Sequence, residues 1–220
     1  MPVRVIPVKY GGRLGYDLAV TGEGATVQDY LDALCAAMEK EPFYRAKNAG
    51  GRCEGCPLCC AERAPLTYID VLRLMGYTGF SGGLLRFLDQ SAFVVASGRV
   101  VDIVLRRGED DFCIFLNRKN CLCAVYPARP LVCRTYICSP LSRRAAKLKE
   151  LVVNAGEDEL VRRWLEEGCR EGRRPVPHAG VRPRPRLSDW EPNAFTGRSC
   201  YREVLLKEIC PPAFWRELRL

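Results

Sequence analysis

Alternating apolar and polar residues open the chain and predict two short strands, at Val3–Val8 and Leu14–Val20. The strands are joined through Gly11-Gly12, and glycine readily adopts the backbone conformations of tight turns. Apolar side chains then recur at helical spacing and predict a helix from Val27 to Lys40, for which Thr26 can act as the N-cap. The chain therefore begins with a ββα element.

Further helices are predicted towards the middle of the chain. Thr67 and Asp70 have the spacing of a capping box, with Asp in place of Glu, and predict a helix that extends to about Met75. A short helix near Leu84–Gln90 is expected to follow. Cys35 lies on the apolar stripe of the first helix, so we expect it to pack in the core and not to bind metal.

A β-hairpin is predicted after these helices. Its strands are Ala92–Ser97 and Val100–Arg106, which are rich in β-branched residues and flank the turn dipeptide Ser97-Gly98. Phe112–Leu116 is expected to add a third strand. The hairpin lies between two groups of cysteines in the sequence.

The last third of the chain changes in character. Leu141 to about Glu171 is predicted to be helical, with a break at Gly156. The segment Arg173–Leu187 is rich in proline and arginine and is expected to be irregular. The tail from Ser188 to Leu220 carries enough aromatic side chains to pack back on the core.

These patterns predict an α+β fold with a small, irregular, metal-stabilised cysteine-rich core. The core is expected to contain short helices and a β-hairpin. We divide the chain into an N-terminal ββα element (1–45), a cysteine-cluster metal-binding domain (46–144) and a helical, Pro/Arg-rich C-terminal extension (145–220).

Cysteine content changes this picture most. The chain has 220 residues and 13 cysteines, an odd number that argues against complete disulfide pairing. The N-terminus lacks the pattern of a secretory signal, and no apolar run approaches the roughly 18–20 residues of a membrane helix. We therefore expect a cytoplasmic protein without membrane association, in which closely spaced thiols bind metal.

The formal charge of +8 counts every cysteine as neutral, whereas cysteines that bind metal are thiolates. Metal binding would therefore offset much of the positive charge, and the basic balance is weak evidence for nucleic acid as a partner. We expect a protein redox partner or a protein substrate instead.

The cysteines fall into two main groups. The first cysteine cluster has the pattern Cys-x2-Cys-x2-Cys-Cys and comprises Cys53, Cys56, Cys59 and Cys60. The second cysteine set comprises Cys113, Cys121, Cys123 and Cys133. Two-residue gaps let a chain wrap around a metal centre, and eight thiolates match one or two [4Fe–4S] clusters as well as zinc sites. The side chains of neighbouring Cys59 and Cys60 are expected to diverge, so that one of them faces a second centre or bridges two centres.

The sequence indicates that a metal binds more firmly than it indicates which metal binds. His178 is the only histidine in the chain, which argues against mixed Cys/His zinc fingers. Zinc ribbons usually contain two separated Cys-x2-Cys knuckles, and the second cysteine set lacks one. An iron–sulfur cluster is therefore favoured, with zinc as the alternative.

With its cysteine groups, the segment from about 50 to 140 resembles the CxxCxxCC zinc- or iron-chelating proteins, also called YkgJ-like cysteine-cluster proteins. The resemblance includes the helix Leu66-Thr67-x2-Asp70-x2-Arg73, then Cys113-x-Phe115-Leu116, then Cys121-x-Cys123-x-Val125-Tyr126-x2-Arg129-Pro130-x2-Cys133-Arg134. It implies binding of zinc, iron or an iron–sulfur cluster. Some similar proteins are flagellin lysine-N-methylases that use S-adenosylmethionine, but no motif for that cofactor is found here.

The leading hypothesis is an iron–sulfur protein that transfers electrons or forms the cluster-bearing part of an anaerobic enzyme. Alternatives are a structural zinc module that binds protein or nucleic acid, and a lysine-methylase-like enzyme. No catalytic residue is identified. Tyr126, Arg129 and Arg134 lie among the cysteines and are candidate cofactor-binding residues, which could tune a cluster or hold an anionic substrate. Alternatively, the two arginines pair with Asp70 or with backbone carbonyls.

Besides Cys35, four cysteines lie outside this pattern, and a structural role is favoured for them over an additional metal site. Cys138 is expected to be buried, although it could substitute for a ligand. The remaining three, Cys169, Cys200 and Cys210, have no ligand spacing.

Overall fold

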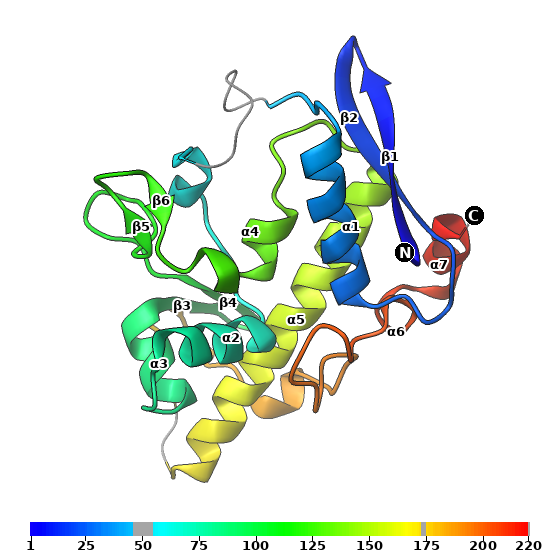
Figure 1. The fold of residues 1–220 in the computed structure, drawn as a ribbon. Helices are drawn as coiled ribbons and strands as arrows, with labels where there is room; N and C mark the ends of the chain where they lie inside the picture. Colours follow the sequence, from blue (N-terminus) through cyan, green and yellow to red (C-terminus); the bar gives the residue numbers. More distant parts are fainter. Residues whose placement is uncertain (46–54, 173–174, 220) are drawn as a thin grey trace.

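The computed structural model describes residues 1–45, 55–172 and 175–219 (Figure 1). The fold is mixed α+β, as the sequence predicts. Its helices are α1 (Val27–Lys40), α2 (Tyr68–Thr78), α3 (Leu84–Ser91), α4 (Leu131–Thr135), α5 (Arg143–Arg170), α6 (Leu206–Ile209) and α7 (Pro212–Leu218). Its strands are β1 (Val3–Tyr10), β2 (Arg13–Val20), β3 (Ala92–Ser97), β4 (Val100–Leu105), β5 (Leu116–Asn117), β6 (Leu122–Cys123) and β7 (Ala179–Val181).

The predicted ββα element is confirmed. Strands β1 and β2 form an antiparallel hairpin in which Val3 pairs with Val20, and α1 packs beside it (Figure 1). Thr26 caps α1, and Asp29 completes a capping box. The expectation for Cys35 is wrong, because its side chain is exposed: the buried stripe of α1 is centred on Tyr30–Leu34, and Cys35 lies at its edge.

The predicted hairpin of β3 and β4 is also confirmed, but its third strand is not the expected one. That strand is β7, which pairs in parallel with β3 and comes from the segment that was expected to be irregular. Residues 112–116 do not form a strand of this sheet: Asp111, at a φ of 62°, turns the chain, and Leu116 begins the small β5–β6 pair instead.

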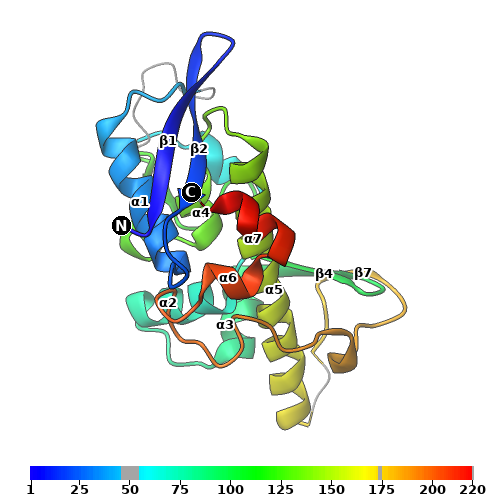
Figure 2. The same cartoon turned by 90° about the vertical axis from the view of Figure 1, so that its right-hand side faces the viewer.

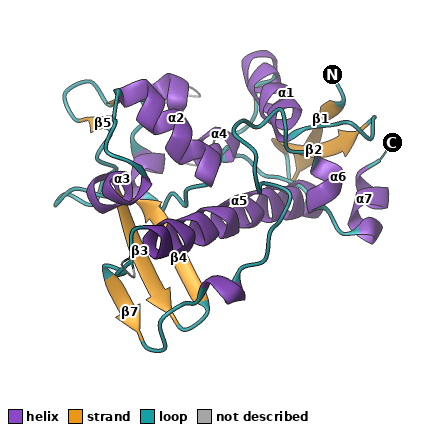
Figure 3. Ribbon diagram, turned by 90° about the horizontal axis from the view of Figure 1, so that it is seen from below, coloured by secondary structure: helices purple, strands orange, loops and turns teal. Residues whose placement is uncertain are grey.

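Helix α5 joins two hydrophobic clusters and crosses most of the molecule (Figures 1 and 3). Its first half packs with the N-terminal hairpin and the C-terminal tail, and its second half packs with α2, α3 and the β3–β4 hairpin. The predicted break at Gly156 is wrong, because α5 is continuous through this residue. Glycine is needed there for a close approach: an added Cβ would lie 2.5 Å from Cγ2 of Thr67.

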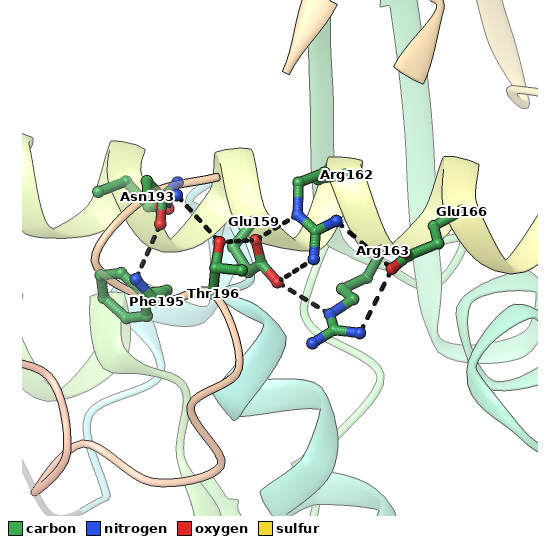
Figure 4. Close-up of polar contacts among 8 residues, drawn as sticks. Glu159, Arg162, Arg163, Glu166, Asn193, Phe195 and Thr196 are labelled. Carbon is green, nitrogen blue, oxygen red and sulfur yellow. Dashed lines mark hydrogen bonds and ion pairs between the residues drawn. The ribbon is translucent and has the colours of Figure 1, made fainter. Parts of the chain in front are cut away.

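The C-terminal tail packs back on the core, as predicted. Helices α6 and α7 lie beside α5 and β2 in Figure 2, and Phe195 and Tyr201 are fully or almost fully buried. Glu159 of α5 anchors this tail, since its carboxylate accepts hydrogen bonds from Thr196 and from Arg162 and Arg163 (Figure 4). None of the helices that the structure describes has the length and apolar content needed to span a bilayer.

Candidate metal centre

Most of the predicted ligand cysteines that the structure describes surround one cavity of about 110 Å³, called here the cysteine cavity. Its wall includes Cys56, Cys59, Cys121, Cys123 and Cys133. Cys56 lies just before the 3₁₀ helix η1 (Leu58–Ala61) and Cys59 lies within it. Cys121 lies in the turn between β5 and β6, Cys123 in β6, and Cys133 in α4. Cys53 lies outside the described residues. The fold thus brings together side chains from both cysteine groups.

Cys60 and Cys113 lie next to this wall. The backbone N–H of Cys113 donates a hydrogen bond to the carbonyl oxygen of Cys60 at 2.8 Å, which joins the two cysteine groups directly. Several of these thiols are close enough to interact electrostatically: Cys60 is affected by Cys113 and Cys123, and Cys133 is affected by Cys113, Cys123 and Cys60. Cys59 belongs to the cavity wall, whereas Cys60 does not.

Burial dominates the chemistry of these thiols. It raises the pKa of Cys60 to about 11, with a further contribution from neighbouring cysteines. The pKa values of Cys113 and Cys133 are raised in the same direction and chiefly for the same reason. Without a metal these groups are therefore neutral thiols at pH 7, and a metal that binds here must displace their protons.

The loop around Cys113 carries a backbone arrangement suited to a metal thiolate. The N–H of Phe115 donates a hydrogen bond to Sγ of Cys113 at 3.5 Å, and such bonds stabilise negative charge on sulfur. The carbonyl of Phe115 in turn accepts a hydrogen bond from the N–H of Ala124, next to Cys123. This loop therefore fixes two of the candidate ligands relative to each other.

Cys133 is held by a buried polar network that also involves α2. Asp70 is completely buried, and its Oδ1 accepts hydrogen bonds from the N–H of Leu131 at 2.8 Å and from the hydroxyl of Tyr201 at 2.5 Å. Leu131 begins α4, the helix that carries Cys133. The Oδ2 atom accepts from the N–H of Thr67, within the predicted capping box. Asp70 therefore caps α2 and positions α4 at the same time.

The candidate cofactor-binding residues take two different positions. Tyr126 and Arg129 both line the cysteine cavity, and the guanidinium of Arg129 lies 3.7 Å from the centre of the Tyr126 ring. Arg134 does not line it and lies 3.9 Å from Asp32. The expected pairing of these arginines with Asp70 is not found, because that carboxylate bonds Leu131, Thr67 and Tyr201 instead.

The remaining cysteines lie away from the cavity wall. Cys138 is half-buried, where burial was expected. Cys169 and Cys200 are exposed, and Cys210 is buried. The sequence could not have identified Tyr201 as a neighbour of the site, because it reaches the site only through tertiary packing. Arg73, which is part of the family resemblance, reaches the site through Nη2, which donates to the carbonyl of Pro127 at 2.7 Å.

Within residues 1–45, 55–172 and 175–219, no three Cys, His, Asp or Glu side chains converge closely enough to hold a single metal ion. The donor set of the cavity nevertheless fits a thiophilic metal, because its wall contains five cysteine side chains and no histidine. His178 lies elsewhere, where its Nδ1 accepts a hydrogen bond from the N–H of Val94.

A cysteine-walled cavity built on a small α+β scaffold is typical of a thiolate metal-binding protein. A comparison with protein families matches residues 52–170, more than half of the chain, to CxxCxxCC, described as a "putative zinc- or iron-chelating domain". The chain belongs to this family, and its cysteine-rich domain chelates zinc or iron. No curated protein and no solved structure matches the chain.

Proposed function

We propose that the cysteine cavity binds an iron–sulfur cluster, and that the protein transfers electrons or forms the cluster-bearing part of an anaerobic enzyme. The observation that supports iron–sulfur over zinc is the arrangement of the cysteines around a cavity of about 110 Å³. A tetrahedral zinc ion needs its four sulfurs only about 3.8 Å apart and leaves no such space between them. A polynuclear cluster would occupy part of that space and take its ligands from cysteines within and next to the wall.

The chain contributes several features that would suit such a cluster. Cys60, Cys113, Cys123 and Cys133 form the candidate set of four ligands, and the remaining cysteines of the wall could bind a second centre. A [4Fe–4S] cluster supplies reversible one-electron transfer when it is bound. The hydrogen bond from Phe115 to Sγ of Cys113 and the burial of the thiols are the features through which the protein would set its reduction potential.

A protein redox partner or protein substrate is supported by apolar side chains at the surface of the site. Four of the exposed large apolar residues come from the loops that carry the cysteines: Leu58, Ile114, Leu122 and Tyr126. Apolar and aromatic side chains are typical of the centres of protein interfaces. We propose that a partner docks over these loops, so that the metal centre lies close to the interface, in a reducing compartment such as the cytoplasm.

Analysis of iron, zinc and acid-labile sulfide in anaerobically purified protein tests the proposal. We expect iron and sulfide in equal amounts and a brown protein. A colourless protein with stoichiometric zinc would contradict it and would support the zinc alternative. Cys60→Ser should lose more iron than Cys59→Ser if the two neighbours serve different centres. Cys169→Ser is the matched control, because this exposed cysteine lies away from the cavity wall.

A further inference from the structure

Three arginines from different elements lie together beside the cysteine cavity and are called here the arginine cluster: Arg73 of α2, Arg129 before α4, and Arg134 of α4. Nη2 of Arg73 donates a hydrogen bond to the carbonyl of Pro127, two residues before Arg129, and Arg134 lies on the short helix that follows Arg129. Like charges that share a half-buried site repel each other, so a neighbouring negative group must offset the cost of placing them together.

The described residues supply too few acceptors for these guanidinium groups. Buried nitrogens without a hydrogen-bond partner among them are Nε of Arg73, Nε of Arg129 and Nη1 of Arg134. Arg73 has one backbone acceptor, the carbonyl of Pro127, and Asp32 lies a distant 3.9 Å from Arg134. A buried donor without an acceptor is costly, which indicates that another group supplies the missing oxygen atoms.

Arg129 connects this cluster with the cavity. Its guanidinium is held in place by stacking on the ring of Tyr126, and both residues belong to the cavity wall. A stacked, planar guanidinium is pre-organised to bind a carboxylate or phosphate through two parallel hydrogen bonds. The same wall includes Val132 and Tyr136, which offer apolar and aromatic surface to the body of a ligand.

From these contacts we infer that the cysteine cavity contains an oxyanion site, in which Arg129, supported by Arg73 and Arg134, binds the carboxylate or phosphate group of a small apolar or aromatic molecule. The inference rests on the proposed function, because it names the class of substrate that would be held beside the metal centre. It assigns Arg129 to direct contact with the ligand. Arg73 and Arg134 would strengthen binding through their charge and their free donors.

Calorimetric titration of the metal-loaded protein with phenyl phosphate and with phenylacetate tests the inference and distinguishes the two oxyanions. We expect saturable binding of at least one of them. Arg129→Gln should weaken that binding about tenfold or more, since a hydrogen bond to a charged group is worth about 1.5–3 kcal/mol. Arg129→Lys should restore it only in part, because a lysine cannot form the bidentate contact.

Arg99→Gln is the matched control, because the side chain of Arg99 is 86% exposed and pairs only with Asp189 among the described contacts. Arg134→Gln provides a second variant should Arg129→Gln fold poorly. Absence of saturable binding to the wild-type protein, or unchanged affinity in both Arg129→Gln and Arg134→Gln, would overturn the inference. Metal content is measured in every sample, so a zinc-loaded protein that binds the anion would refute the proposed iron–sulfur function and leave the oxyanion site standing.

Discussion

Removal of one buried hydroxyl, in Tyr201→Phe, should destabilise the protein by about 2 to 3 kcal/mol. The hydroxyl donates a hydrogen bond to Asp70, and because its single proton is used there, it accepts one from the hydroxyl of Thr67 at 2.8 Å. A hydrogen bond to a charged group contributes about 1.5–3 kcal/mol and a neutral one about 0.5–1.5 kcal/mol. The lower part of the summed range applies, since Oδ1 of Asp70 keeps its bond from Leu131.

Denaturant unfolding of the metal-loaded protein, followed by circular dichroism under anaerobic conditions, measures this loss. Tyr77→Phe is the matched control: Tyr77 lies on the same helix as Asp70 but is 51% exposed, so the change should stay within about 0.5 kcal/mol. Asp70→Asn should be more severe, about 3–5 kcal/mol, because an amide group would place its N–H₂ against backbone donors.

A second measurement connects the network with the metal site. Asp70 also accepts a hydrogen bond from the N–H of Leu131, at the start of the helix that carries Cys133. Loss of the Tyr201 hydroxyl should loosen this helix, so Tyr201→Phe should release its metal to a chelator faster than Tyr77→Phe does. Equal stability and equal rates of metal release in the two variants would refute the conclusion that Tyr201 and Asp70 position the ligand helix.

Three further predictions concern α5 and the metal itself. Gly156→Ala should destabilise the fold by about 1–3 kcal/mol despite the better helix propensity of alanine, because the new Cβ would overlap the side chain of Thr67. If denaturant unfolding showed equal or higher stability, the close approach of Thr67 to α5 at Gly156 would be contradicted. Burial raises the pKa of Glu157 from its usual value of 4.5 to about 7, although the N–H of Ile103 donates to its carboxylate. Because the pKa of Glu157 is higher in the folded state than in the unfolded state, the contribution of this carboxyl group to stability is complete below pH 4.5 and is lost as the pH rises to about 7. Glu157→Gln should therefore be more stable than wild type at pH 8, by at most about 3 kcal/mol, and should lose that advantage at pH 4.5. A stability difference that does not depend on pH would contradict this. Removal of the metal with a chelator should lower the midpoint of thermal unfolding, because the proposed ligands Cys60 and Cys133 would lose the bonds that hold their loops together. An unchanged midpoint would show that the metal does not stabilise the fold.

Local signals in the sequence predicted much of the secondary structure. The capping box of Thr67 and Asp70 forms as expected, and the strands at 92–97 and 100–105 pair as a hairpin. These features depend on residues within a few positions of each other, so their sequence spacing is sufficient to indicate them. The errors at Gly156 and at 112–116 arose where a distant element, or a residue with positive φ, decided the local backbone.

In the candidate site, too, the sequence indicated local features but not contacts between distant residues. Spacing alone identified both cysteine groups, because metal ligands in loops recur at short, regular intervals. It could not indicate that Asp70 bonds Tyr201 or that Arg129 stacks within the cavity wall, although Tyr126 and Arg129 were recognised as candidates. Only tertiary packing brings a tyrosine from the C-terminal tail to a helix cap far away in the sequence.

The sequence by itself therefore determined the class of the protein, and it indicated the candidate thiol donors and most of the local elements that carry them. The tertiary structure decided which thiols share one cavity, which carboxylate supports the helix of Cys133, and which guanidinium groups are left short of acceptors. The physical reason is that burial and hydrogen bonding between residues such as Asp70 and Tyr201, which are distant in the sequence, depend on how the whole chain packs around α5.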